Sequence, residues 1–239
     1  MIFNKYKIFI AFTAVLIVGF IPLKNTWSDK ILFHVVDPRT QDIQFFRSNE
    51  KGLLLRSIQN LKTYVEGNNR ILTFAMNGGM YNKDHTPVGL FIQNNITIAP
   101  LNKSEGSGNF FLKPNGVFYI TANNVPAICK TENFEDNGKI KFATQSGPML
   151  VVDNQIHQAF KEGSKNLNIR NGVGILPNNK ILFAISKTEI NLYDFAKYFL
   201  DMGCKNALYL DGSVSRAYLP EKNWIQLDGD FGVMIGITE

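Results

Sequence analysis

The sequence of 239 residues contains few of the residues that build metal sites or disulfide frameworks. It has two cysteines, Cys129 and Cys204, and three scattered histidines, His34, His85 and His157. No C-x-x-C motif is present, so a zinc site made of cysteine and histidine is not indicated and a disulfide-rich scaffold is excluded. The cysteines are compatible with one Cys129–Cys204 bridge in an oxidising compartment and equally with two buried free thiols.

Several catalytic signatures are also missing. The chain contains no G-x-x-x-x-G-K-[ST], no H-E-x-x-H and no G-x-S-x-G. The nearest candidate for a dinucleotide-binding loop, residues 172–177, ends in proline and enters a predicted hairpin where that motif requires a helix. These absences argue against a P-loop nucleotide enzyme, a zinc protease of that type and an α/β-hydrolase.

Positive charge is concentrated at the N-terminus. The formal net charge is +5, but Lys5, Lys7 and Lys24 lie within the first 28 residues, which contain no acid, and the remainder carries about +2. A nearly neutral body without a Lys/Arg cluster gives no electrostatic footprint for DNA or RNA, so no nucleic-acid partner is expected.

The first 28 residues resemble an export signal. Lys5 and Lys7 precede an uninterrupted apolar run of 14 residues, from Ile8 to Ile21. This run is shorter than the roughly 20 residues that span a bilayer, which favours a cleaved signal peptide over a transmembrane helix. Because no A-x-A site follows, an uncleaved signal anchor stays open. We expect residues 29–239 to be extracytoplasmic, either periplasmic or secreted, with any membrane attachment made by residues 8–21.

The rest of the chain predicts one α+β domain, residues 29–239, without a linker or a low-complexity segment. With 45% hydrophobic residues, it is long enough for a substantial core. Alternation predicts a first strand at 31–36 with a partner at 43–46, and helical spacing predicts a helix at 49–66. Four hairpins follow, with strands at 90–93 and 96–99, 118–121 and 125–128, 149–152 and 155–158, and 173–176 and 180–186.

A second helix and a final short strand complete the predicted fold. Asn191 as N-cap and Asp194 three residues later imitate a capping box, an apolar face extends to Leu200, and Gly203 stops the helix. The strand at 207–210 delivers Asp211 to its end. The fold class is therefore α+β, with two main helices and antiparallel or mixed β-sheets built from successive hairpins.

Five polar, glycine-rich clusters follow predicted strands, where functional loops are usually found. A single cluster of this kind can be explained by turn chemistry alone, so the functional interpretation depends on the presence of five clusters in one fold. They are Asn77-Gly78-Gly79-Met80-Tyr81, Gly106-Ser107-Gly108-Asn109, Gln145-Ser146-Gly147-Pro148, Ile169-Arg170-Asn171-Gly172 and Leu210-Asp211-Gly212-Ser213-Val214-Ser215.

These clusters resemble those of the phosphodiester glycosidase family, the domain type of the uncovering enzyme that removes N-acetylglucosamine from a sugar-phosphate diester. The resemblance covers roughly residues 70–219, and the similarity is greatest to the exported bacterial branch. It rests on the stretches MNGGMY, PVGLFI, GSGNFFLKPNGVFYI, ATQSGPMLV, IRNGVG and NALYLDGSVS. Many relatives resemble LDGGGS where this chain has LDGSVS.

The chemistry of that family identifies two candidate catalytic residues. Cleavage of a sugar C1–O–phosphate bond expels a phosphate ester, a weakly basic leaving group, so a strong general acid is less necessary than in ordinary glycosidases. Arg170 is the candidate for binding the phosphate, because its planar guanidinium binds two oxygens at once. Asp211 is the candidate for activating water or stabilising the oxocarbenium-like carbon. The predicted substrate-binding residues are Asn77, Gly78, Gly79, Asn109, Ser146, Gly147, Asn171, Gly212 and Ser213.

Other roles for these residues stay open at this point. Arg170 and Asp211 can form a structural ion pair, and Asp211-Gly212 can be only a turn. Asp211 can also bind a divalent cation, although no cofactor is expected. Glu105 and Glu189 are further carboxylates beside the clusters, and the sequence does not rank them.

The sequence thus favours an exported hydrolase that cleaves the C1–O–phosphate bond of a sugar-1-phosphodiester, with a small-molecule or glycan sugar phosphate as its partner. The alternative is a noncatalytic glycan- or phosphate-binding envelope protein with the same fold. A third candidate is an envelope interaction protein without a small-molecule pocket.

Overall fold

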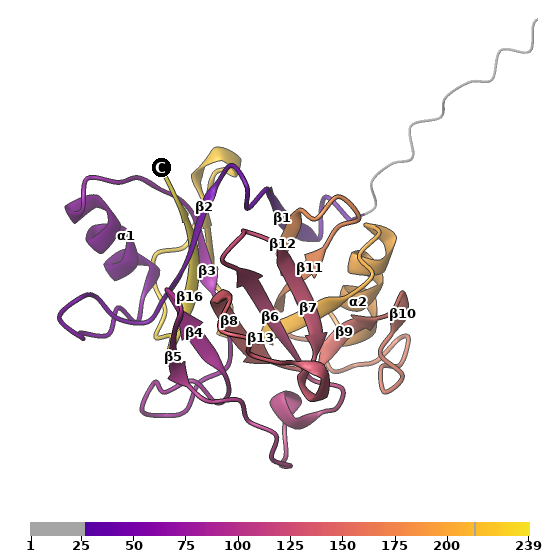
Figure 1. The fold of residues 1–239 in the computed structure, drawn as a ribbon. Helices are drawn as coiled ribbons and strands as arrows, with labels where there is room; N and C mark the ends of the chain where they lie inside the picture. The colour runs from indigo at the N-terminus through magenta and orange to yellow at the C-terminus, as the bar shows by residue number, and fades with distance from the viewer. Residues whose placement is uncertain (1–26, 213) are drawn as a thin grey trace, which may run out of the picture.

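The computed structural model describes residues 27–212 and 214–239 and contains three β-sheets and two α-helices (Figure 1). All strand pairings in these residues are antiparallel, which confirms the α+β prediction. The helices are α1 (Ile58–Gly67) and α2 (Leu192–Asp201), and three short 3-10 helices cover Asn109–Phe111, Thr131–Asn133 and Pro220–Lys222.

Each sheet combines strands that lie far apart in the sequence. The first has the order β1 (Ile31–Val36), β12 (Ile181–Ser186), β11 (Asn171–Ile175), β13 (Ala207–Asp211), β9 (Met149–Val152), β10 (Gln155–Ile156). The second has the order β15 (Trp224–Ile225), β14 (Ala217–Leu219), β3 (Leu72–Asn77), β16 (Met234–Thr238), β2 (Asp42–Phe46). The third has the order β5 (Ile96–Ala99), β4 (Phe91–Gln93), β8 (Ile140–Ser146), β6 (Gly116–Thr121), β7 (Pro126–Lys130).

The main core lies where the inner faces of the three sheets meet. Phe45 of β2 stacks on Phe91 and Phe142 of the third sheet, with ring centroids 6.3 and 5.2 Å apart, and approaches Phe118 at 5.6 Å. Only 1% of Phe45 is exposed. Aromatic rings bury large apolar areas, so this contact between β2 and the third sheet is a major source of the domain's stability.

The two helices cover outer faces of the sheets (Figure 1). Helix α2 packs on β9 and β10 through buried residues that include Phe195 and Phe199. Its start agrees with the prediction: the side-chain oxygen Oδ1 of Asn191 accepts from the Asp194 backbone N–H at 2.8 Å, and Asn191 Nδ2 donates to the Asp194 carboxylate at 2.8 Å. Gly203 ends the helix at φ +86°, a conformation that favours glycine.

The predicted hairpins are confirmed, and asparagine explains their turns. Each of the four loops contains at least one non-glycine residue in the left-handed region: Asn94 and Asn95, Asn124, Asp153 and Asn154, and Asn179. Asn and Asp tolerate positive φ because their short polar side chains bond locally.

Two sequence predictions about the N-terminal half are wrong. The helix predicted at 49–66 begins only after Ser57, whose side chain accepts from the Asn60 N–H at 3.2 Å. Before it, Gly52 and Arg56 have φ values of +78° and +64°, and Leu54 bridges to Ser48, so this stretch cannot be helical. The strands at 31–36 and 43–46 are also not partners, because β1 pairs with β12 and β2 pairs with β16.

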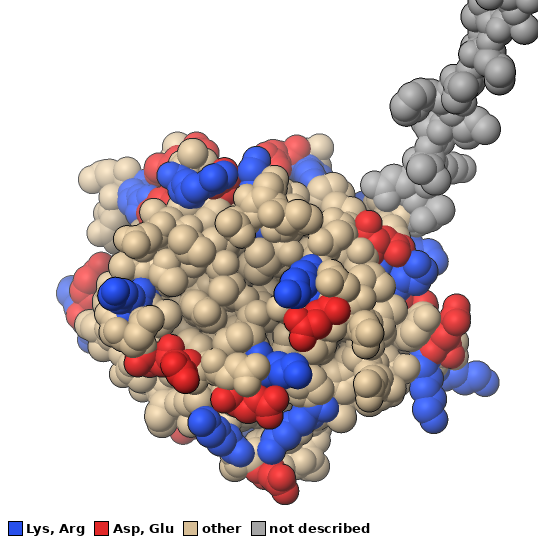
Figure 2. Space-filling view, turned by 45° about the vertical axis from the view of Figure 1, so that its right-hand side comes forward, with Lys and Arg blue, Asp and Glu red and all other residues tan. Residues whose placement is uncertain are grey.

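The predicted signal segment lies outside the described residues, except for its last two. Trp27 packs on Tyr198 of α2 with ring centroids 5.8 Å apart. No helix in residues 27–212 or 214–239 is long and apolar enough to cross a bilayer. Cys129 and Cys204 are both free thiols, so the disulfide alternative is not realised in this structure. Acidic and basic side chains are interspersed on the face shown in Figure 2.

We predict that Phe45→Ala lowers the free energy of unfolding by about 3–5 kcal/mol, because the variant leaves a cavity among three aromatic rings. Phe45→Leu is expected to cost less, since it keeps much of the buried volume. Urea denaturation followed by circular dichroism measures both. The exposed Ile225→Ala is the control, expected within about 0.5 kcal/mol of wild type. A loss below about 1 kcal/mol for Phe45→Ala would contradict this account of the core.

Candidate active site

Residues from all three sheets meet at one end of the core. Asp211 ends β13 and pairs across the first sheet with Asn171, which begins β11. Asn77 ends β3 of the second sheet, and Ser146 ends β8 of the third. Four of the five glycine-rich clusters therefore supply residues to one place, which we call the three-sheet junction (Asn77, Ser146, Asn171, Asp211).

The carboxamides of Asn77 and Asn171 join the first two sheets. The Asn171 Nδ2 group donates to the Asn77 backbone oxygen at 2.9 Å and to Asn77 Oδ1 at 3.0 Å, while Asn171 Oδ1 accepts from the Asp211 backbone N–H at 2.8 Å. Asn77 Oδ1 also accepts from the Arg216 N–H at 3.0 Å. Both asparagines are completely buried. With these bonds, Asn77 and Asn171 position Asp211.

Two hydroxyls connect the third sheet to the same place. Ser146 Oγ donates to the Leu210 backbone oxygen at 2.7 Å, immediately before Asp211. Thr144 Oγ1 donates to the Gly78 backbone oxygen at 3.0 Å, immediately after Asn77. Both residues are buried, where a hydrogen bond left unmade is costly. The ends of β13 and β3 are therefore held from the side by β8.

The Asp211 carboxylate is the ionisable group of the junction. Its Oδ1 accepts from the Gly212 N–H at 2.7 Å, and its Oδ2 accepts from Asn77 Nδ2 at 3.2 Å. Burial raises its pKa from 3.8 to about 6, against the lowering effect of these two hydrogen bonds. Asp211 nevertheless stays partly exposed. A carboxylate with a pKa near 6, open to solvent on one side, suits a general base or acid.

Arg170 is buried, with 1% of its surface exposed, and its hydrogen-bond partners in the described residues are neutral. Nε donates to the Ile190 oxygen at 2.7 Å, and NH2 donates to Asn166 through its backbone oxygen at 2.9 Å. NH1 donates to the Tyr209 hydroxyl at 3.1 Å and carries a second N–H. Arg170 also lines a cavity of about 240 Å³ together with Asn109 and Tyr193.

Tyr209 connects Arg170 to the junction, and sequence analysis missed it. Its hydroxyl lies 2.7 Å from the position that a Cβ on Gly212 would occupy, and the Asn109 side chain approaches it. Burial raises the pKa of Tyr209 to about 12, so the hydroxyl is neutral at physiological pH. No salt bridge joins Arg170 and Asp211, so the structural ion pair that the sequence left open is not formed. Its place on β13, two residues before Asp211, was the available signal for Tyr209.

Tyr81 is a second residue near the junction that was not assigned a role. Burial raises its pKa to about 12, and the negative charge of Asp211 contributes in the same direction. Its ring stacks on His85 with centroids 5.6 Å apart, and His85 Nε2 lies 2.8 Å from the Asp230 carboxylate. Tyr81 is the last residue of the predicted cluster Asn77-Gly78-Gly79-Met80-Tyr81, so its place in that cluster was the available signal.

The glycines of the site are required by close packing against protein. A Cβ on Gly79 would lie 2.6 Å from Thr144 Oγ1, and one on Gly147 would lie 2.6 Å from Asn115 Cβ. A Cβ on Gly78 would meet Ile235 at 2.8 Å. The predicted role of these glycines in letting backbone approach a substrate remains a prediction.

Three further candidates from the sequence are Ser213, Glu105 and Glu189. Ser213 lies outside the described residues. Glu105 is exposed and pairs with Lys113 at 3.5 Å, and Glu189 is exposed. In residues 27–212 and 214–239, no group of three or more His, Cys, Asp or Glu side chains is placed to hold a metal ion.

We predict that the raised pKa of Asp211 appears in the pH dependence of stability. Between about pH 4 and pH 6 the unfolded chain releases the Asp211 proton while the folded chain keeps it, so the free energy of unfolding falls as pH rises. Relative to Asp211→Asn, wild type should lose about 2 kcal/mol over this interval. Urea titrations at pH 4, 5, 6 and 7 measure the difference, in which any constant effect of the substitution cancels. Parallel curves for the two proteins would contradict the shift.

The chain is similar to known proteins in sequence and in fold. The family model described as phosphodiester glycosidase matches residues 71–232. The chain is 32% identical over 220 residues to the uncharacterized protein YigE of Escherichia coli K12, covering 90% of this chain and 86% of that protein.

Two solved structures share the fold. One is the catalytic domain of zebrafish N-acetylglucosamine-1-phosphodiester alpha-N-acetylglucosaminidase auto-inhibited by its pro-peptide, with a TM-score of 0.55, 14% identity and 88% of each chain covered. The other is a putative exported protein of Burkholderia pseudomallei, with a TM-score of 0.56, 10% identity and coverage of 87% of this chain and 73% of that one. On the family match and the 32% identity over nearly its whole length, the chain belongs to the phosphodiester glycosidase family.

Proposed function

We propose that this protein is an exported hydrolase that cleaves the C1–O–phosphate bond of a sugar-1-phosphodiester. The observation that carries the proposal is Asp211: a partly exposed carboxylate with a pKa of about 6, fixed by hydrogen bonds at the junction of three sheets. Family membership supplies the reaction class.

In the proposed reaction, the bond between C1 and the bridging oxygen breaks, and its electron pair goes to the phosphate ester. A water oxygen forms the new bond to C1, and its proton passes to Asp211. The positive charge that develops at C1 is stabilised by the same carboxylate. Because the leaving phosphate monoester is weakly basic, the reaction needs no strong acid on the opposite side.

Arg170 is the proposed phosphate-binding residue. Its second NH1 hydrogen and the adjoining cavity of about 240 Å³ support this role, and Tyr209 holds the guanidinium in place. Asn109 is exposed beside the same cavity and is proposed to bind a sugar hydroxyl or a phosphate oxygen. Gly212 and Ser213 are proposed to complete the substrate site beside Asp211. Asn77, Asn171 and Ser146 are proposed to act through the position of Asp211.

We also propose that the reaction needs no cofactor. Both carboxylate oxygens of Asp211 accept from N–H groups, and a bound cation would instead need further oxygen ligands around it. Export is proposed on the basic and apolar pattern of the first 21 residues, with the mature protein in the periplasm or outside the cell.

The direct test is hydrolysis of a panel of sugar-1-phosphodiesters by the full chain, with and without EDTA, measured as released reducing sugar and phosphate monoester. Asp211→Asn should lower kcat by at least about 10³-fold with little change in binding, as expected for a group that acts in the transition state. Asp153→Asn, the same change in the exposed β9–β10 turn, is the matched control and should keep full activity.

No release from any diester by a folded protein would sink the hydrolase proposal. Binding of the same diesters without turnover would then support the glycan- or phosphate-binding alternative. Loss of activity in EDTA, restored by a divalent cation, would overturn the cofactor-free proposal.

A separate prediction concerns pH. If Asp211 acts as the base, kcat/KM should rise about tenfold per pH unit below its pKa and level off above about pH 6. The measurement is kcat/KM between pH 4 and pH 8 on one diester. A rate that falls across this range as pH rises would show that the protonated form of Asp211 is the active one.

A further inference from the structure

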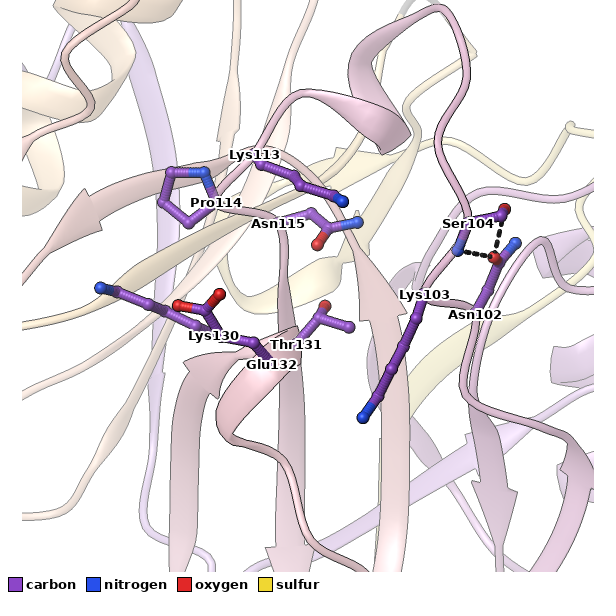
Figure 3. A pocket seen from close by; sticks show the side chains of 9 residues that line it. All are labelled: Asn102, Lys103, Ser104, Lys113, Pro114, Asn115, Lys130, Thr131 and Glu132. Carbon is purple, nitrogen blue, oxygen red and sulfur yellow. Dashed lines mark hydrogen bonds between the residues drawn. The ribbon is translucent and has the colours of Figure 1, made fainter.

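A second cavity, of about 480 Å³, is lined by none of the residues at the three-sheet junction. Three segments surround it: residues 102–104, residues 113–115 and residues 130–132 (Figure 3). Its volume is within the range of about 300–1,000 Å³ that is usual for small-molecule sites. We call it the lysine cavity, after Lys103, Lys113 and Lys130 on its three segments.

A buried glutamine fixes two of these segments. Gln145, 2% exposed, accepts from the Leu90 and Asn102 backbone N–H groups at 3.0 and 2.9 Å through Oε1. Its Nε2 group donates to the Asn102 backbone oxygen at 2.7 Å and to Thr131 Oγ1 at 3.2 Å. Three of the four hydrogen bonds of the carboxamide therefore go to Asn102 and Thr131, which line the cavity, and hold these two segments together.

Hydrogen bonds to its backbone oxygens hold the third segment, residues 113–115, in place. The Ala159 N–H donates to Nδ1 of His157, so the ring proton lies on Nε2. Nε2 therefore donates to the Lys113 backbone oxygen at 3.1 Å. The Pro114 oxygen accepts from the Met149 N–H at 2.9 Å. The next oxygen along the chain, that of Asn115, accepts from the Thr131 N–H at 3.0 Å. The cavity is thus formed in advance of any ligand, which lowers the entropic cost of binding.

The charge of the cavity is predominantly positive. Lys103 and Lys130 lie on opposite sides of it in Figure 3, and neither forms an ion pair within the described residues. Lys113 pairs with Glu105 at 3.5 Å, but both side chains are more than half exposed, so this pair is weak. Glu132 is the single carboxylate that lines the cavity among the described residues.

The cavity also offers groups suited to sugar hydroxyls. Glu132 can accept hydrogen bonds, and Thr131 already accepts from Gln145, which leaves its own O–H to donate. An inorganic anion needs only donors, whereas these groups include both donors and acceptors. We propose that the lysine cavity binds an anionic saccharide, a sugar bearing phosphate or carboxylate, with Lys103 and Lys130 binding its anionic groups from the two sides of the cavity.

This inference does not depend on hydrolysis at Asp211, because it concerns binding at a separate cavity. The test is isothermal titration calorimetry of the full chain with four probes: a phosphorylated maltose, digalacturonate, neutral maltose and inorganic phosphate. The first two separate phosphate from carboxylate as the source of charge. At least one of them should bind tenfold or more tightly than maltose and inorganic phosphate, with an affinity that falls as salt rises.

The double variant Lys103→Gln/Lys130→Gln should weaken binding of the charged disaccharide at least tenfold. Lys51→Gln/Lys139→Gln removes the same charge from two exposed lysines outside the cavity and should leave the affinity unchanged. Both variants are expected to keep the wild-type melting temperature, because these ammonium groups form no hydrogen bond or salt bridge with residues 27–212 or 214–239.

Three results would overturn the proposal. One is no binding of either charged disaccharide. The second is an equal loss in both double variants, which would assign the binding to overall charge. The third is inorganic phosphate binding as tightly as the sugars, which would show a simple anion site. Hydrolysis of a diester by the Lys103→Gln/Lys130→Gln protein reports separately on the proposed function.

Discussion

The site depends on the buried carboxamide pair of Asn77 and Asn171, which joins the ends of strands from two different sheets. Buried amides must have partners, and here each amide satisfies the other while also bonding the backbone or side chain of Asp211. Asn77 is further fixed by the Arg216 N–H, so its amide cannot rotate without losing a bond to each neighbour. The position of the Asp211 carboxylate is therefore a consequence of how the sheets join, and the core beneath the junction holds the sheets together.

This arrangement also explains the unusual electrostatics of Asp211. The junction surrounds the carboxylate with protein and raises its pKa, yet provides two N–H donors that keep the ionised form accessible near neutral pH. Arg170 does not neutralise it, because the guanidinium is directed to backbone oxygens and to Tyr209. No salt bridge joins the buried Arg170 and the partly buried Asp211, and Arg170 donates to the Tyr209 hydroxyl.

Much of the local structure was predictable from the sequence. Turn chemistry predicted the four hairpins, because asparagine and aspartate in the loops take up positive φ. The capping pattern at Asn191 predicted the start of α2, and four of the five glycine-rich clusters meet at the three-sheet junction. The helix at 49–66 failed in its first half because Leu53 and Leu54 matched the helical period by chance, while Gly52 and Arg56 required left-handed backbone. Hydrophobic periodicity carries no information about the backbone conformation of single residues.

The sequence by itself determined the fold class and the family, and it indicated Asn77, Asn171 and Asp211 as candidate site residues, since these follow from short-range patterns and from motifs. Only the tertiary structure decided that strands 31–36 and 43–46 enter different sheets, and that Tyr209 stands between Arg170 and Asp211. The same holds for Gln145, which joins two walls of a cavity by bonding Asn102, 43 positions before it, and Thr131, 14 positions before it. The physical reason is that strand pairing and side-chain hydrogen bonds between distant segments depend on the whole packing arrangement, which no local pattern encodes.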